Sequence, residues 1–253
     1  MRAWRLASLR RGAVKGDPFE TARRVMVARI AAQGMARSDK VLRAMMRVPR
    51  HLFVPPEYAS EAYDEKPLPI GHGQTISAPG VVARIVELLD PSLGEKVLDV
   101  GTGSGYQAAV LAEIVAPSDS PRSRWGHVWS IERIPELAEL ARENLARAGY
   151  DDRVTVVVGD GSKGYQPAAP YKRIAVGAAA PEVPQPLVAQ LEEGGRLVMP
   201  VGEALSQKLI VVEKMHGGRL VRREDIEVVF VPLVGEYGFK SKGGVEGGWP
   251  LSI

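Results

Sequence analysis

The stretch from Val97 to Tyr106 constrains the fold of this chain more than any other, because it joins a short apolar strand to alternating glycines. Gly101, Gly103 and Gly105 follow the strand at every second position. Without a Cβ atom, these residues can adopt positive φ and let a ligand lie against the backbone, while a following helix presents its first N–H groups to that ligand. The pattern predicts a nucleotide-cofactor turn, although a strand-to-helix turn of purely structural purpose would use similar residues.

From Lys96 onward, short apolar runs alternate with helical patterns, which predicts right-handed crossovers and a parallel sheet. After Gly202 the alternation stops, and Gly217 and Gly218 separate two runs that predict an antiparallel pair at the sheet edge. The expected fold class is therefore α/β, with a Rossmann-like, mostly parallel, doubly wound sheet and an antiparallel C-terminal edge pair. The expected strands are Val97–Val100, Val128–Ile131, Val154–Val158, Ile174–Val176, Leu197–Pro200, Lys208–Glu213 and Ile226–Val231, and the expected helices are Gln107–Val115, Pro135–Ala148 and Pro186–Gln190.

An N-terminal helical segment is expected ahead of this sheet. Residues Phe19 to Arg47 have a helical periodicity that Gly34 interrupts, which predicts two helices. The proline-rich stretch His51–Pro69 predicts an irregular wrap, and a further helix is expected over Pro79–Leu89. The core positions expected in the first two helices are Val25, Ile30, Val41, Leu42 and Met45.

The composition excludes several kinds of protein. With 253 residues, 45% hydrophobic and 25% charged, the chain has the make-up of an ordinary globular protein, and no apolar run is long enough to cross a bilayer. The absence of cysteine excludes disulfides, thiolate zinc sites and thiol nucleophiles. No secretory signal follows the arginine-rich start, so we expect a cytoplasmic protein without a membrane partner. We expect no metal site, because the histidines are scattered at His51, His72, His127 and His216.

Positive charge is concentrated at the N-terminus, although the formal net charge of the whole chain is only +3. A basic arm of this kind can bind RNA. Because neither interleaved aromatic residues nor a nucleic-acid motif accompanies it, we expect a solvated terminus and no nucleic-acid partner, with an RNA-binding arm as the alternative. The residues concerned are Arg2, Arg5, Arg10, Arg11, Lys15, Arg23 and Arg24.

Carboxylates follow the second and third strands of the predicted sheet. A parallel sheet binds ligands at the carboxyl ends of its strands, so Glu132 is placed to accept hydrogen bonds from both ribose hydroxyls of a nucleoside. Its alternative role is to cap the helix that begins at Pro135. After the third strand, Asp160 is placed to pair with an adenine amino group and Gly161 to allow close approach, although Asp-Gly is also an ordinary turn pair.

The spacing of the glycines separates two candidate cofactors. The third glycine, Gly105, comes one residue earlier than in the dinucleotide fingerprint. The turn from Asp99 to Gly105 resembles the first motif of class I methyltransferases, in which the glycines approach the methionine part of S-adenosylmethionine. The resemblance implies this cofactor, with S-adenosylhomocysteine as product. We expect one methyltransferase domain over residues 1–253, with N-terminal helices and a substrate loop over about 19–90, the cofactor-binding sheet over 96–202, and the strand pair and tail over 203–253.

Five segments together resemble the protein-L-isoaspartate O-methyltransferase family, over about Asp39 to Phe239. The resemblance implies a protein repair enzyme that moves a methyl group from S-adenosylmethionine to the free α-carboxylate of L-isoaspartyl residues in damaged proteins and peptides. The methyl ester then collapses to a succinimide without the enzyme. Because the substrate carboxylate has a reference pKa of roughly 3.5–4, it is already ionised at neutral pH and needs no general base. The segments are Pro67–Pro79, Asp99–Tyr106, Gly159–Gly161, Ala178–Pro181 and Val231–Leu233.

The resemblance also implies a set of site residues. Ser77 matches the active-site serine of that family, and we expect its hydroxyl to orient the substrate carboxylate. Its alternative role is to cap the helix expected at Pro79. The cofactor-binding residues so implied are Ile76, Ser77, Ala78, Asp99, Gly101, Thr102, Gly103, Ser104, Gly105, Glu132, Arg133, Asp160 and Gly161. The substrate-binding residues are Thr75, Ser77, Pro79, Val231, Pro232 and Leu233.

Three residues depart from the family pattern. Gly80 stands where the family usually has histidine, Lys172 where it has aspartate, and Gly177 where it has threonine. We expect the missing ring at Gly80 to open one wall of the cofactor pocket, and activity to be retained with altered affinity. Two other functions stay open: a class I methyltransferase that acts on RNA or a small molecule, and a cofactor-binding protein without turnover.

Overall fold

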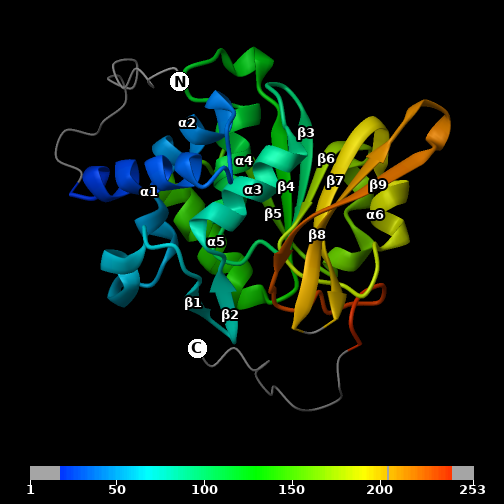
Figure 1. The fold of residues 1–253 in the computed structure, drawn as a ribbon. Helices are drawn as coiled ribbons and strands as arrows, with labels where there is room; N and C mark the ends of the chain where they lie inside the picture. The colour runs from blue at the N-terminus through cyan, green and yellow to red at the C-terminus, as the bar shows by residue number, and fades with distance from the viewer. Residues whose placement is uncertain (1–17, 204, 241–253) are drawn as a thin grey trace.

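The computed structural model describes residues 18–203 and 205–240, which form a seven-stranded sheet with helices on its faces (Figure 1). Its strands are β3 (Lys96–Val100), β4 (His127–Glu132), β5 (Val154–Val158), β6 (Tyr171–Val176), β7 (Leu191–Glu203), β8 (Ser206–Lys214) and β9 (Leu220–Val228). The strand order is β5-β4-β3-β6-β7-β8-β9, parallel from β5 to β7 and antiparallel beyond. Because β4 and β6 lie on opposite sides of β3, the connections diverge there and open a crevice at the carboxyl ends of the strands.

The helices of the described residues cover the sheet unequally. They are α1 (Glu20–Ala32), α2 (Asp39–Arg47), α3 (Pro79–Leu89), α4 (Tyr106–Val115), α5 (Pro135–Ala148) and α6 (Gln185–Ala189). On one face α3, α4 and α5 pack on the strands, and α1 and α2 pack on those helices in turn. The short α6 packs on the other face. Central strands such as β3 are therefore buried from both sides, which explains why Val97, Leu98 and Val100 are all apolar and fully buried.

Local signals set several of these boundaries. Both α3 and α5 begin at a proline, whose fixed φ suits the first helical position. Gly149 ends α5 in the left-handed conformation at φ 76°, which glycine adopts without a steric penalty. Between α1 and α2, Gly34 has φ 71° and breaks the helical run as its sequence position predicted.

The predicted α/β architecture is confirmed, and its errors are local. Val25 is 59% exposed, so its assignment to the core was wrong, because the adjacent Met26 and Val27 occupy the buried side of α1. The strand expected over Ile226–Val231 was misplaced, because β9 begins at Leu220 and ends at Val228.

The stretch expected to be an irregular wrap contains regular structure as well. It begins with two 3-10 helices, Arg50–Phe53 and Pro56–Glu61. A hairpin of β1 (Leu68–Gly71) and β2 (Gln74–Ile76) follows and projects beside the ends of the sheet strands (Figure 1). His72 has φ 52° in its turn. The sequence did not predict this hairpin because its strands are too short for an alternating pattern to appear.

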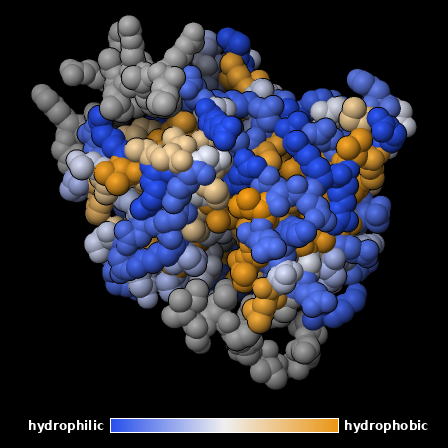
Figure 2. Space-filling view, in the orientation of Figure 1, coloured by the Kyte–Doolittle hydropathy of each residue, from blue (hydrophilic) through white to orange (hydrophobic). Residues whose placement is uncertain are grey.

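Most of the basic N-terminal residues, Arg2 to Lys15, lie outside the described residues, as does Gly243–Ile253. Figure 2 shows hydrophilic side chains over much of the visible face, with hydrophobic ones gathered over the half that holds the sheet. Within 18–203 and 205–240, no helix is both long enough and apolar enough to span a membrane.

Candidate active site

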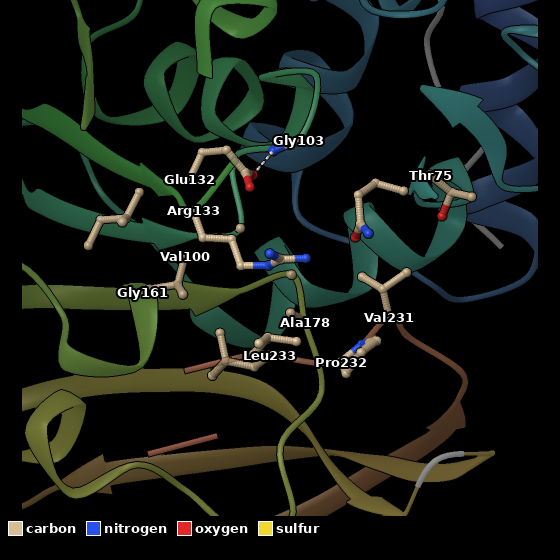
Figure 3. A pocket seen from close by; sticks show the side chains of 15 residues that line it. Thr75, Val100, Gly103, Glu132, Arg133, Gly161, Ala178, Val231, Pro232 and Leu233 are labelled. Carbon is tan, nitrogen blue, oxygen red and sulfur yellow. Dashed lines mark hydrogen bonds between the residues drawn. The ribbon is translucent and has the colours of Figure 1, made fainter. Parts of the chain in front are cut away.

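A pocket of about 530 Å³, part of it open to solvent, lies at the carboxyl ends of β3, β4 and β6 (Figure 3). Nine residues expected at the site line it: Thr75, Gly101, Gly103, Glu132, Arg133, Gly161, Val231, Pro232 and Leu233. The lining residues that were not assigned there from the sequence are Gln74, Val100, Ile131, Gly177, Ala178 and Val234.

The chain after β9 reaches this pocket by pairing with the chain after β6. The Ala179 N–H donates to the Val231 carbonyl at 2.8 Å, and the Leu233 N–H donates to the Ala179 carbonyl at 2.6 Å. Two of the motifs that carried the family resemblance are therefore hydrogen-bonded to each other. Their meeting places Val231–Leu233 opposite the cofactor turn (Figure 3).

The glycines of the turn have the conformations that their spacing predicted. Gly101, Gly103 and Gly105 have φ of 88°, 54° and 93°. A Cβ atom on Gly103 would lie 3.2 Å from Ile70 Cδ1 of β1, and one on Gly105 would lie 3.2 Å from Leu145 Cγ of α5. The absence of side chains thus lets the hairpin and α5 pack closely on the turn as well as leaving room for a ligand.

Glu132 ends β4 with its side chain at the pocket, as expected. It is 6% exposed, and its carboxylate accepts hydrogen bonds from the Gly103 N–H and the Ile134 N–H, each at 3.0 Å. A carboxylate has about four lone-pair sites, so both oxygens retain acceptor capacity. The bond to Ile134 places the carboxylate against the residue before α5, in line with the capping role, and the bond to Gly103 joins the turn to the adjacent strand. The contact of Glu132 with a ribose stays a prediction.

Asp99 takes no part in lining the pocket, because it is fully buried inside β3. One carboxylate oxygen accepts from Gln107 Nε2 at 2.8 Å and the other from Ser130 Oγ at 2.6 Å. Ser130 Oγ also lies 2.6 Å from Thr102 Oγ1. Asp99 therefore links β4, the turn and α4 behind the pocket. Burial raises its pKa to about 6, the two hydrogen bonds oppose this rise, and the nearby Glu132 charge adds to it.

Asn144 supports the turn and was not expected from the sequence. It is the only asparagine in the chain, and it is 2% exposed in α5. Its Nδ2 donates to the Ser104 carbonyl at 2.9 Å. Its helical position gave no sign of this bond, because the partner lies forty residues earlier in the chain.

Asp160 points away from the pocket lining and into the C-terminal segment. Its carboxylate accepts from the Ser162 N–H and Oγ at 2.9 and 2.6 Å, and from the Glu236 N–H at 2.9 Å. Burial alone would raise the pKa of Asp160, but these donors outweigh it and hold the pKa below its ordinary value. The structure thus gives Asp160 a bracing role, and its pairing with adenine stays a prediction. Gly161 lines the pocket, and a Cβ there would lie 2.5 Å from Val100 Cγ1.

The loop from β2 to α3 carries Ser77 beside the pocket rather than in its lining. The suggested helix-capping role of Ser77 is wrong, because the N-cap of α3 is Ala78 and no side chain caps it. Within the described residues, the Ser77 hydroxyl makes no hydrogen bond, which leaves it available to a ligand. Three other expected residues, Ile76, Ala78 and Pro79, are likewise outside the lining, as are Thr102, Ser104 and Gly105 of the turn.

Gly80 does not open a wall of the pocket, contrary to expectation, because Glu65 fills the space beside it. The Gly80 N–H donates to Glu65 Oε1 at 2.8 Å, and a Cβ on Gly80 would lie 2.6 Å from the same oxygen. Lys172 lies near the start of β6, where its Nζ donates to the Glu193 carbonyl at 3.1 Å, at the opposite end of that strand from the pocket. Of the three departures only Gly177 lines the pocket.

Replacing Gly80 with alanine should destabilise the protein by about 1–2 kcal/mol, because Glu65 must move and the Gly80 N–H loses its acceptor. In a Glu65→Ala background the same change should cost much less, since the colliding carboxylate is gone. Denaturant unfolding of the four proteins measures this coupling. Equal costs of Gly80→Ala in both backgrounds would show that Glu65 is not what requires a glycine.

The pocket residues fit S-adenosylmethionine. Glu132 offers free acceptor sites for a ribose diol, the glycine turn gives close backbone approach, and Ile131 and Leu233 add apolar surface. Figure 3 shows the Arg133 side chain extending from the end of β4 toward Ala178. The fold and this pocket define a class I S-adenosylmethionine-dependent methyltransferase.

Comparison with known proteins narrows this class to one family. The sequence profile of protein-L-isoaspartate(D-aspartate) O-methyltransferases matches residues 21–238. A protein-L-isoaspartate O-methyltransferase of Hyperthermus butylicus is 60% identical over 88% of this chain and 92% of its own, and one of Aeropyrum pernix is 58% identical over 94% and 87%. A crystal structure from Plasmodium falciparum, described as such an enzyme in complex with S-adenosyl-L-homocysteine, superposes with a TM-score of 0.72 at 26% identity, over 83% of this chain and 96% of that one. The chain belongs to the protein-L-isoaspartate(D-aspartate) O-methyltransferase family.

Proposed function

We propose that this pocket transfers the methyl group of S-adenosylmethionine to the free α-carboxylate of L-isoaspartyl residues in damaged proteins and peptides. One observation carries the proposal: the same pocket is lined by the cofactor turn and by two segments that lie outside the parallel sheet. Gly101, Gly103 and Glu132 supply the first part, while Thr75 and Val231–Leu233 supply the second. A cofactor and a peptide side chain can therefore meet in one cavity.

The residues of the turn and of β4 hold the cofactor, with Glu132 accepting from the ribose hydroxyls and Gly101 and Gly103 giving backbone contact. Bound S-adenosylmethionine supplies an electrophilic methyl group on a sulfonium. The substrate carboxylate is ionised at neutral pH, so the protein needs no base to activate it. Its task is to hold one carboxylate oxygen in line with the methyl group, and such positioning can lower a barrier by up to roughly 7–11 kcal/mol.

Thr75, Ser77 and Val231–Leu233 bind the isoaspartyl peptide in this proposal. The Ser77 hydroxyl donates a hydrogen bond to the substrate carboxylate and orients it, since no described residue occupies that donor. The partners of the enzyme are isoaspartyl proteins and peptides, and it works in the cytoplasm as one methyltransferase domain. The basic residues from Arg2 to Lys15, which suggested RNA as an alternative substrate, lie outside the described residues.

The activity is tested by incubating the protein with labelled S-adenosylmethionine and a peptide that contains isoaspartate, beside the same peptide with normal aspartate. We expect label in the isoaspartyl peptide alone. Equal labelling of both peptides would contradict the assigned specificity. Binding of S-adenosylhomocysteine without labelling of either would favour a protein that has lost turnover.

Replacing Ser77 with alanine should lower kcat about tenfold, corresponding to the loss of one hydrogen bond of about 1.4 kcal/mol in the transition state. The affinity for S-adenosylhomocysteine should stay within a factor of about two, because the hydroxyl acts on the peptide. Ser92→Ala, an exposed serine in the loop before β3, serves as the control. Steady-state kinetics with the isoaspartyl peptide decide the matter, and an unchanged kcat would remove Ser77 from the site.

A further inference from the structure

Arg50 is a buried cation that holds the backbone of the Ser77 loop. It belongs to the 3-10 helix Arg50–Phe53 and is fully buried. Its Nη2 donates to the Ser77 carbonyl at 2.8 Å, and its Nε donates to the Ala62 carbonyl at 2.7 Å. One guanidinium thus fixes the residue proposed to orient the substrate and, at the same time, the chain just after the next 3-10 helix.

The same guanidinium also contacts the helix that follows the cofactor turn. Its Cζ lies 4.7 Å from the ring centroid of Tyr106, which is the first residue of α4 and is 1% exposed. Tyr106 follows Gly105 directly, so the cation–π contact reaches the end of the glycine turn. Arg50 therefore lies between the two parts of the site that must be aligned for methyl transfer.

Burying Arg50 in this environment lowers the stability of the folded protein. No carboxylate among the described residues forms an ion pair with it, and its buried Nη1 makes no hydrogen bond there. Burial lowers the pKa of Arg50 to about 10, although the nearby Tyr106 and the Glu65 charge oppose this fall, so the group is still charged at neutral pH. Removing a charge from water without an ionic partner is unfavourable, and well-packed hydrophobic residues often replace buried ionic groups without loss of stability. A purely structural role explains such a cation poorly.

We propose that Arg50 is a positioning residue for methyl transfer, which holds the Ser77 loop in register with the end of the cofactor turn. It does not touch the reacting atoms. Its planar guanidinium donates to the Ala62 and Ser77 carbonyls and lies over the Tyr106 ring, and this arrangement sets the distance between the loop and α4. This inference rests on the role proposed for Ser77, because the alignment matters only if Ser77 orients the substrate carboxylate.

Two variants test the proposal. Arg50→Lys keeps the charge but cannot direct separate donors to Ala62 and Ser77 while stacking on Tyr106. Arg50→Met fills the volume without charge or donors. We expect both variants to lower kcat by about tenfold to a hundredfold, because a small displacement of a group that positions the substrate can reduce the rate by about this factor. The dissociation constant of S-adenosylhomocysteine should change less than about threefold, and Arg50→Met should melt no lower than Arg50→Lys.

Arg153 provides the control, as a buried arginine that, unlike Arg50, also forms an ion pair, with Glu113 at 3.4 Å. It is 6% exposed, donates to the carbonyls of Ala116 and Gly149, and lies 4.2 Å from the ring centroid of Tyr150, yet none of these residues lines the pocket. Arg153→Lys should lower the melting temperature and leave kcat per folded molecule at the wild-type value. The stoichiometry of S-adenosylhomocysteine binding counts the folded molecules in each preparation.

The double variant with Ser77→Ala separates this inference from the proposal on which it rests. If Arg50 acts through Ser77, adding Arg50→Lys to Ser77→Ala should cost clearly less than its effect on the wild-type enzyme. Arg50 variants with wild-type kcat per folded molecule would overturn the inference, even if Ser77→Ala is impaired. The inference would also be overturned if the decrease in kcat of the double variant equalled the product of the decreases in the two single variants, since the two residues would then act independently. A wild-type kcat in Ser77→Ala would instead refute the role of Ser77 itself.

Discussion

Replacing Glu132 with glutamine should raise the dissociation constant of S-adenosylhomocysteine about a hundredfold, or about 3 kcal/mol, because two kinds of interaction are lost together. Hydrogen bonds from ribose hydroxyls to a carboxylate become weaker bonds to a neutral amide. The amide also has one acceptor oxygen, so it cannot accept from both the Gly103 N–H and the Ile134 N–H, each now 3.0 Å from the carboxylate. The turn that contacts the cofactor is then less well held.

Calorimetric titration with S-adenosylhomocysteine measures the effect. Glu136→Gln is the matched control, because this exposed glutamate lies in the first turn of α5 and does not line the pocket. An affinity of Glu132→Gln equal to wild type would show that the carboxylate serves the turn and α5 but not the ligand. A fall in melting temperature of the ligand-free protein reports the bracing role separately.

The sequence predicted the sheet and the cofactor turn well because their signals are local. A short, mostly apolar run predicts a strand that is buried on both faces, such as β3, without reference to the rest of the chain. A glycine in the sequence likewise indicates a position where the backbone can adopt positive φ, as Gly101 does. The order of the strands along the chain then places the turn and Glu132 at one edge of the sheet. Gly101, Gly103 and Glu132 do line the pocket, whereas other residues of the turn, such as Gly105, lie outside its lining.

The supporting contacts of the site could not be predicted, because their partners are far apart in the chain. Asp160 accepts from the Glu236 N–H, seventy-six residues away, and a carboxylate that follows a strand looks the same from the sequence whether it faces a ligand or a loop. The same holds for the bond of Asn144 to Ser104. A sequence pattern predicts which residues lie at the edge of a sheet. It does not predict which of them form hydrogen bonds with distant parts of the chain instead of with a ligand.

Gly80 shows the same limit for a departure from a family pattern. The missing side chain implied an empty wall, yet the structure places the Glu65 carboxylate there. A substitution in one segment can be matched by a side chain from another, and only the packing reveals the pair. Lys172 lies away from the pocket for a simpler reason, since it is near the opposite end of its strand.

The unfolding free energy of the wild-type protein should fall by about 3 kcal/mol relative to Asp99→Asn as the pH rises from about 3 to about 7. Burial raises the pKa of Asp99 to about 6, whereas an unfolded aspartate has a pKa of about 3.9. Below both values the acid is neutral in both states and burial of its charge costs nothing. Between them the unfolded chain releases the proton first, so the folded state loses stability. The loss levels off about one pH unit above the folded pKa, near pH 7.

Denaturant unfolding of the two proteins at several pH values between about 3 and about 7 measures this difference. The asparagine amide does not titrate and can still accept from Ser130, so Asp99→Asn should fold. Ser130→Ala keeps the acid but removes a hydrogen bond that lowers its pKa, so its loss of stability should extend to higher pH. Glu132→Gln removes a charge that raises this pKa and should shift the loss to lower pH. If the stability of wild type and that of Asp99→Asn depend on pH in the same way, Asp99 ionises without a cost in stability. If the loss of stability moves to higher pH in Ser130→Ala and to lower pH in Glu132→Gln, Asp99 is the group that titrates.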